Sequence, residues 1–234
     1  MKISINETLI NRNKKLSQIV LYISLGILAI GFLWTIRNTS PSSSLWGYLL
    51  LIPVYLLVQI SIFMTNKWAR SPRPDEVVVQ SLKGLNDLHH LYIYTTPIPY
   101  FLVGPAGIWI INPYHHEGEI TYHSEKGRFE QKGGGNFLTK FFAQDSLPNL
   151  MRDSINSKRL LERFFNSEKI KMGSEPQVVN IFYSENANVR AKNAPVPTIQ
   201  AKKLKDTIRR FSKENILSQQ EILTITEALP QETS

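Results

Sequence analysis

The sequence predicts a transmembrane hairpin of two helices followed by one soluble α/β domain. Three observations support this prediction. Two uncharged apolar runs stand near the N-terminus, at residues 16–36 and 45–64. Beyond residue 75, β-rich runs alternate with amphipathic helical patterns. A chain of 234 residues is long enough for such an anchor and one domain of ordinary size.

Both apolar runs are long enough to cross a bilayer. A helix of about 20 residues spans about 30 Å of hydrocarbon, and both runs lack Asp, Glu, Lys and Arg. Pro53 lies in the second run, where a lipid-embedded helix tolerates a kink. A cleaved signal peptide is the alternative, but the length of the first run and the second run close behind it favour two spans.

The distribution of basic residues predicts the orientation of the hairpin. The basic residues that flank the two spans are Arg12, Lys14, Lys15, Lys67, Arg70 and Arg73. The loop between the spans contains only Arg37. Because cytoplasmic flanks of membrane helices are enriched in Lys and Arg, we expect a multi-pass protein of the cell membrane with both termini in the cytoplasm. Residues 1–15 are then a cytoplasmic tail.

The composition limits the chemistry that the chain can perform. It contains no cysteine, which excludes a disulfide framework, a thiolate zinc site and a cysteine nucleophile. The net charge is +8. Residues 1–64 carry five basic and one acidic side chain, which leaves 22 basic and 18 acidic side chains beyond them. This small excess of basic side chains is compatible with nucleic acid or an anionic membrane surface as partner. It is smaller than the concentrated positive charge of a strong phosphate-binding surface.

The soluble part is predicted to form one domain at residues 75–212, joined to the anchor by a linker at residues 65–74. A short amphipathic helix opens the domain at residues 75–85, because Val78, Leu82 and Leu85 recur at helical spacing. We predict strands at residues 91–95, 100–103, 108–111, 119–123, 127–131 and 177–183 in one continuing sheet, and helices at residues 148–165 and 199–211. A further helix starts at Ser218, where Glu221 completes a capping box, within a C-terminal segment at residues 213–234.

Several of these segments resemble the nuclease-related domain family called NERD. The resemblance covers residues 75–212, and the segments that support it are Val103–Gly107, Ile108–Ile111, Gly118–Ile120, Lys158–Leu161, Val178–Ser184 and the helix around Leu204. It implies a restriction-endonuclease-like fold of the PD-(D/E)XK type, with a mixed sheet flanked by helices. It also implies a magnesium site built from a helical Glu, an Asp that opens one strand and a Glu-x-Lys that ends the next.

The positions that correspond to this magnesium site hold unsuitable residues. Glu76 stands at the helical position, Pro99 replaces the Asp, and Asn112 and Tyr114 replace the Glu and the Lys. Proline offers no ligand, asparagine offers a neutral oxygen, and tyrosine has no permanent positive charge. Residues 93–116 contain no Asp, Glu, Lys or Arg at all. We therefore expect a pseudoenzyme that needs no cofactor.

Two other groups of residues are candidate sites. The five histidines all lie between residues 89 and 123, and His115, His116, Glu117 and Glu119 could supply a two-histidine, one-carboxylate metal site. The alternative is solvated histidines, because adjacent residues on a strand point to opposite faces. Nucleic acid could contact the basic residues Lys202, Lys203, Lys205, Arg209 and Arg210, although a solvated helix face explains the same pattern.

The sequence thus predicts a membrane-anchored NERD-like domain that acts by binding or scaffolding. The bilayer is one partner, and a protein or a nucleic acid is the other. The first alternative is an active magnesium-dependent nuclease with relocated ligands, such as Glu76 with Glu117, Glu119 and one of the paired histidines. The second alternative is a module that joins membrane complexes without binding nucleic acid.

Overall fold

The computed structural model describes residues 1–37, 41–134, 147–214 and 216–230, and it describes no side chains for residues 41–52. The chain forms two compact units. One consists of Met1–Asn6, Pro74–Asn136 and Asp145–Ser234, and the other of Glu7–Arg73 with Phe137–Gln144. The segment before the first long helix therefore belongs to the same unit as the C-terminal domain.

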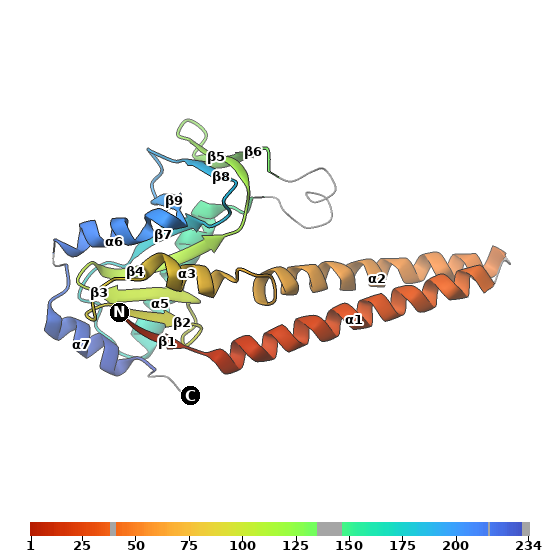
Figure 1. The fold of residues 1–234 in the computed structure, drawn as a ribbon, viewed down its shortest axis with the longest axis horizontal. Helices are drawn as coiled ribbons and strands as arrows, with labels where there is room; N and C mark the ends of the chain where they lie inside the picture. The colour runs from red at the N-terminus through yellow and green to blue at the C-terminus, as the bar shows by residue number, and fades with distance from the viewer. Residues whose placement is uncertain (38–40, 135–146, 215, 231–234) are drawn as a thin grey trace. The chain divides into compact units, whose positions relative to one another are not determined.

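The second unit contains two long helices, α1 (Glu7–Arg37) and α2 (Pro41–Trp68), which lie side by side as a hairpin (Figure 1). By length and composition, α1 is the one helix found among the described residues that could cross a membrane. Only 6% of its most apolar stretch is buried, whereas a core helix of a soluble protein would be mostly covered. The predicted second span falls within α2, but its first part, residues 45–52, lies outside the described side chains.

The first unit is built on a mixed sheet of six strands, in the order β1-β2-β3-β4-β7-β9. These strands are β1 (Lys2–Ile5), β2 (His90–Ile93), β3 (Tyr100–Gly104), β4 (Gly107–Tyr114), β7 (Gln177–Phe182) and β9 (Thr198–Gln200). β2, β3 and β4 form an antiparallel meander, and β7 lies parallel to β4. The predicted α/β class with a mixed sheet flanked by helices is confirmed.

The strand β1 corrects the prediction of a cytoplasmic tail at residues 1–15. Lys2–Ile5 pairs in parallel with β2, and α1 already starts at Glu7. Four residues carry too weak a local pattern to predict a strand. The pairing depends on β2, which lies more than 80 residues away in the sequence.

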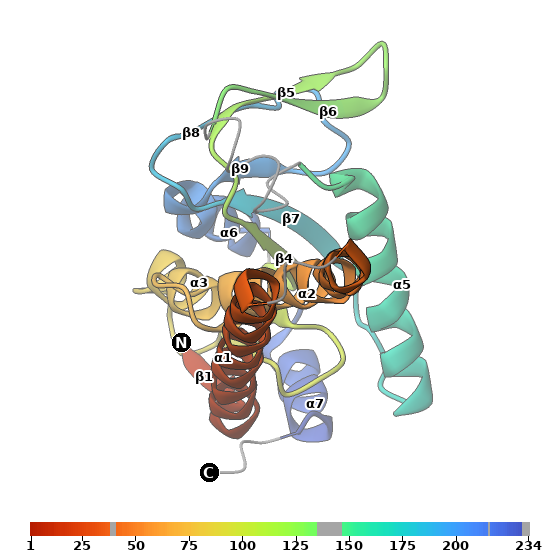
Figure 2. The same cartoon turned by 90° about the vertical axis from the view of Figure 1, so that its right-hand side faces the viewer.

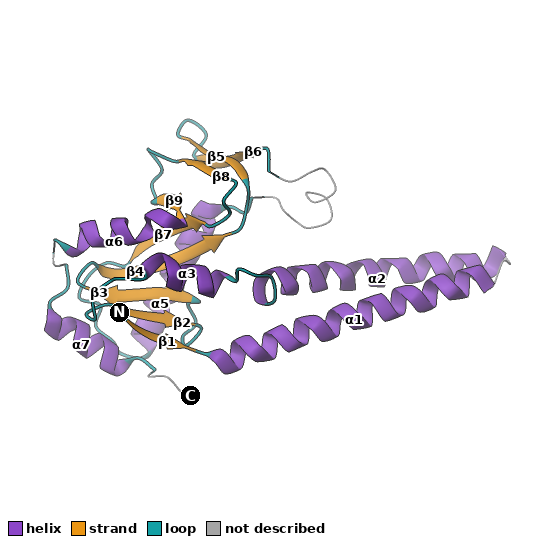
Figure 3. Cartoon of the chain, in the orientation of Figure 1, coloured by secondary structure: helices purple, strands orange, loops and turns teal. Residues whose placement is uncertain are grey.

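A second sheet corrects the prediction that strands 119–123 and 127–131 continue the main sheet. β5 (Gly118–His123), β6 (Arg128–Lys132) and β8 (Ala187–Arg190) form a separate sheet in the order β6-β5-β8, drawn in orange in Figure 3. The chain leaves β4 through Gly118, which has a φ of 86°. A Cβ there would lie 2.5 Å from the Lys132 carbonyl oxygen, so only glycine fits this change of direction.

Helices cover both faces of the main sheet. One face packs against α3 (Pro74–Leu82), the 3-10 turn η1 (Ala201–Lys203) and α6 (Leu204–Ser212), and the other against α5 (Leu150–Ser167) and α7 (Gln219–Ala228). Figure 2 shows α3 and α6 on the side opposite α5. The predicted helix at residues 199–211 is corrected at its start, because Thr198–Gln200 pairs with β7 as a strand. The predicted capping box of Ser218 and Glu221 is confirmed.

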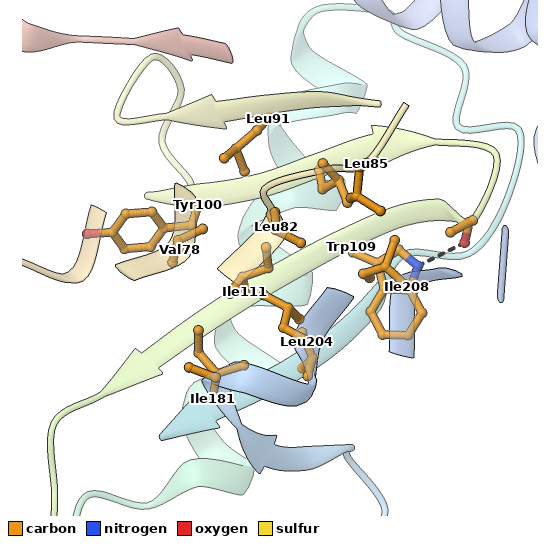
Figure 4. Packing of buried hydrophobic residues seen from close by; sticks show 14 of the residues in the cluster. Val78, Leu82, Leu85, Leu91, Tyr100, Trp109, Ile111, Ile181, Leu204 and Ile208 are labelled. Atoms are coloured by element: carbon orange, nitrogen blue, oxygen red, sulfur yellow. Dashed lines mark hydrogen bonds between the residues drawn. The ribbon is translucent and has the colours of Figure 1, made fainter. Parts of the chain in front are cut away.

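Trp109 anchors the core between β4, α3 and α6. Its ring is fully buried, and its Nε1 donates a hydrogen bond of 2.8 Å to the Ala106 carbonyl oxygen (Figure 4). Leu82 and Ile208 belong to the same apolar cluster. Complete burial of one large apolar side chain contributes about 1.5–3 kcal/mol, so this cluster is a main source of the stability of the domain.

The His89 ring packs closely against Gly104 of β3. This contact predicts that one methyl group added at Gly104 lowers the stability of the protein. A Cβ at Gly104 would lie 2.6 Å from His89 Cδ2, and the buried imidazole is held by Asn86 Oδ1 at 2.6 Å and Ser212 Oγ at 3.2 Å. We expect Gly104→Ala to destabilise the full-length protein by about 1–3 kcal/mol through overpacking. Denaturant unfolding in detergent measures this cost. When the same Gly104→Ala change is made in the His89→Ala protein, its destabilising effect should be smaller by at least about 0.5 kcal/mol. An equal effect in both backgrounds would contradict the contact between Gly104 and His89.

Candidate functional site

Asn112 and Tyr114, two positions of the implied nuclease site, lie in the last part of β4. The antiparallel pairing of β3 with β4 reaches Phe101 and Ile110, and Pro99 directly precedes β3. On the other side, β7 places Asn180 directly beside Asn112. The side chains around Asn112 decide what this part of the sheet can bind.

Asn112 belongs to a network of neutral side chains, which we call the asparagine network. Asn112 Nδ2 donates to Asn180 Oδ1 at 3.2 Å, and Ser157 Oγ donates to Asn112 Oδ1 at 3.3 Å. Ser154 Oγ lies 3.2 Å from the same Asn180 oxygen, and Asn180 Nδ2 donates to Thr198 Oγ1 at 3.4 Å. Asn180 is completely buried. These amides and hydroxyls satisfy one another, as buried polar groups must.

The asparagine network does not fit a magnesium ion. Mg²⁺ is usually held by carboxylates together with water and phosphate oxygens, whereas all five members of this network are uncharged. Tyr114, at the position of the lysine, donates its hydroxyl hydrogen to Asp153 Oδ2 at 3.2 Å. Burial, and then the neighbouring Asp153, raise the pKa of Tyr114. The hydroxyl therefore stays neutral and cannot replace an ammonium group.

The buried acid of α3 is Asp75 and not Glu76. Glu76 is exposed, whereas only 4% of Asp75 is accessible. Asp75 lies close enough to Tyr100 to influence its pKa, which is raised first by burial and then by Tyr94, Asp75 and Tyr183. The hydroxyls of Tyr94 and Tyr100 are hydrogen-bonded to each other. Sequence reasoning did not single out Asp75, although Asp75, Val78 and Leu82 share one helical face.

The structure disperses the candidate metal ligands. The rings of His115 and His116 lie 4.6 Å apart. Glu117 Oε1 accepts a hydrogen bond from Ser184 Oγ at 3.2 Å, and Glu119 Oε1 forms an ion pair with Arg190 Nη1 at 2.9 Å. Within the described parts of the chain, no group of three or more His, Cys, Asp or Glu side chains is placed to hold a metal ion.

A groove of about 740 Å³ lies between the small sheet and β9. Its cations are Arg190, Lys192 and Lys203, which come from β8, from the β8–β9 connection and from η1. Its lining otherwise consists of neutral residues, including the Tyr122 ring. Sequence reasoning missed Arg190 and Lys192, because β8 and its partner β5 were not recognised as neighbours.

The five basic residues predicted to contact nucleic acid have different surroundings. Lys203 lines the groove. Arg209 Nη2 instead donates to the Gly84 carbonyl oxygen at 2.8 Å, and the Arg210 guanidinium lies 5.4 Å from the Phe211 ring centre. Lys202 is exposed and Lys205 is half-buried, and the groove lining includes neither.

Comparisons with protein-family models, with curated proteins and with solved structures find no match for this chain. Its class therefore follows from the fold and the site alone. It is a mixed α/β domain, and the described residues include one helix that could cross a membrane, by length and composition.

Removal of Asn180 tests whether the asparagine network supports the fold. We expect Asn180→Leu, which keeps the side-chain size, to destabilise the protein by about 1–3 kcal/mol, because Ser154 and Asn112 lose a buried partner. Asn156→Leu on the exposed side of α5 is the matched control and should change stability by less than about 0.5 kcal/mol. Urea unfolding in detergent compares the two. Equal effects would show that the network contributes nothing specific.

Proposed function

We propose that this chain is a membrane-anchored, NERD-like protein whose domain works by binding and lacks metal-dependent nuclease activity. The observation that supports this function is the asparagine network at the corner where the resemblance implies a magnesium site. Function depends on the side chains of a site and not on the scaffold. Here neutral amides and hydroxyls bond to one another where carboxylates would be needed.

The order of elements supports the NERD-like part of the proposal. α3 is followed by the meander β2-β3-β4, then by α5, and then by β7 parallel to β4. The resemblance implies such a mixed sheet flanked by helices. The alternative of an active nuclease requires Glu76 to join Glu117, Glu119 and a paired histidine. It is disfavoured because Glu117 and Glu119 are engaged with Ser184 and Arg190.

The connectivity of the main sheet supports a hairpin anchor. β1 precedes α1 and β2 follows α2, yet β1 and β2 are neighbours in one sheet. A folded sheet lies entirely on one side of a bilayer, so the chain crosses an even number of times between them. If α1 crosses, a return crossing is required before β2, and α2 is the long helix in that interval. The basic flanks of the hairpin favour a cytoplasmic domain.

A nuclease assay tests the loss of catalytic activity. The full-length protein, purified in detergent, is incubated with plasmid DNA, linear DNA and RNA in the presence of Mg²⁺ or Mn²⁺. We expect no cleavage, because the carboxylates that would hold the ion are missing. Cleavage that disappears in Glu76→Ala but persists in the surface variant Glu185→Ala would overturn the proposal. Salt-dependent retention of DNA or RNA in the same preparation identifies nucleic acid as partner, and no retention favours a protein partner.

Single-cysteine labelling tests the anchor, and the absence of native cysteines makes every label specific. We place one cysteine at the start of α1 (Thr8→Cys), one between the two helices (Thr39→Cys) and one in the domain (Glu227→Cys). A membrane-impermeant maleimide should label Thr39→Cys in intact cells. The other two variants should react only after permeabilisation. Labelling of Thr8→Cys and Glu227→Cys from opposite sides of the membrane would refute the hairpin.

A further inference from the structure

Two helices that cover the same face of the main sheet also present apolar side chains to solvent. The inner faces of α5 and α7 meet in one apolar cluster, which includes Leu161, Phe165, Ile222 and Ile225. Among the described residues outside the hairpin, large apolar side chains are exposed at Ile3, Leu88, Ile155, Leu160 and Leu223. Three of these lie on α5 and α7, so the outer side of this helical layer carries apolar surface as well.

The exposed face of α5 is positively charged. Its exposed charged side chains are Arg152, Arg159 and Arg163, whereas the acids of α5, Asp153 and Glu162, are half-buried. Within the described parts of the chain, none of the three arginines forms an ion pair. Arg159 and Arg163 are one helical turn apart, and like charges at this spacing repel each other. An acidic partner would relieve this repulsion, and arginine is enriched where proteins contact one another.

A hollow of about 330 Å³ lies beside this row of arginines. Ile155, which is 53% exposed, forms part of its lining. The other apolar residues of the lining are Val178, Val196, Pro176, Pro195 and Pro197. Lys158 and Glu175 also line the hollow and form an ion pair with each other. Arg152 and Arg159 stand three residues before and four residues after Ile155, so they lie on the same side of α5.

The outer face of α7 has the complementary chemistry. Residues 219–228 contain two acids, Glu221 and Glu227, and no Lys or Arg. Leu223 is 49% exposed and stands four residues before Glu227, so both lie on one side of the helix. Glu221 completes the capping box with Ser218, whereas Glu227 is exposed. The outer face of α7 therefore combines one apolar anchor with an acid.

We propose that two copies of the domain associate through these faces, with α5 of each copy against α7 of the other. Leu223 of one copy enters the hollow beside Ile155 of the second copy, and Glu227 meets the row of arginines at the solvent-accessible rim of the contact. Because α5 and α7 belong to the same layer, a two-fold axis between them forms both contacts at once. The dimer goes beyond the proposed function, since the copies associate whether or not the domain cleaves nucleic acid.

Charge exchange between the two helices tests this contact. Analytical ultracentrifugation of the full-length protein in detergent measures the dissociation constant, and we expect the wild-type protein to dimerise. Arg159→Glu and Glu227→Arg should each weaken the dimer about tenfold or more, which corresponds to about 1.4 kcal/mol, because each change places like charges opposite each other in both contacts. A mixture of the two variants should dimerise as well as the wild type, since both contacts of the mixed dimer pair opposite charges. The control Lys126→Glu, in the turn between β5 and β6, should change nothing.

Disulfide formation tests the position of Leu223. The chain has no cysteine, so a cross-link can form only between introduced residues. Copies with Ile155→Cys and copies with Leu223→Cys, produced together with different tags, should be joined on oxidation, because a disulfide requires two Cα atoms within about 7 Å. Copies with Ile155→Cys and copies with Leu88→Cys are the matched control and should stay separate. Thermal unfolding confirms that each variant is folded.

Three results would overturn the dimer. They are a wild-type protein that stays monomeric throughout the micromolar range, a mixture of the two charge variants that associates no better than either variant alone, and equal cross-linking in the control pair. A dimer that survives both charge reversals would equally contradict the contact. The outcome is separate from the nuclease assay, because cleavage of DNA would refute the proposed loss of catalysis and leave the dimer unaffected.

Discussion

The pairing of β1 with β2 joins the two ends of the helical hairpin into one sheet. Lys2 N donates to the His89 carbonyl oxygen at 2.9 Å, and Asn6 N donates to that of Ile93 at 3.0 Å. Along the chain, α1 and α2 therefore lie between two strands that are neighbours in one sheet. The exposed apolar surface of α1 must be covered by lipid or protein, because such a surface is costly in water.

The two ends of β4 have different surroundings, one apolar and one polar. Its first residues, including Trp109 and Ile111, are buried among apolar side chains from α3 and α6. Its last residues carry the amide of Asn112 and the hydroxyl of Tyr114, which bond to neutral or acidic neighbours on β7 and α5. There the neutral side chains of the asparagine network bond to one another, and two of its hydroxyls also bond to backbone carbonyl oxygens.

The small sheet gives the domain a second polar surface, away from the asparagine network. It exists because Gly118 turns the chain out of β4 and because β8 returns 70 residues later to pair with β5 in parallel. This pairing aligns Arg190 with Thr121, and Arg190, Lys192 and Lys203 are all among the residues that line the groove. The small sheet and the asparagine network are thus built from different parts of the chain.

The sequence by itself determined the features that depend on local pattern. Apolar runs and helical periodicity predicted the long α1, the mixed sheet with flanking helices, and the helix that starts at the capping box of Ser218 and Glu221. Only the tertiary structure decided the features that depend on distant partners. The strands β1, β8 and β9 have three or four residues each, and such short segments become strands because hydrogen bonds from a remote neighbour satisfy their backbone groups. The burial of Asp75 and the meeting of Arg190, Lys192 and Lys203 follow from the same long-range packing, which no local pattern encodes.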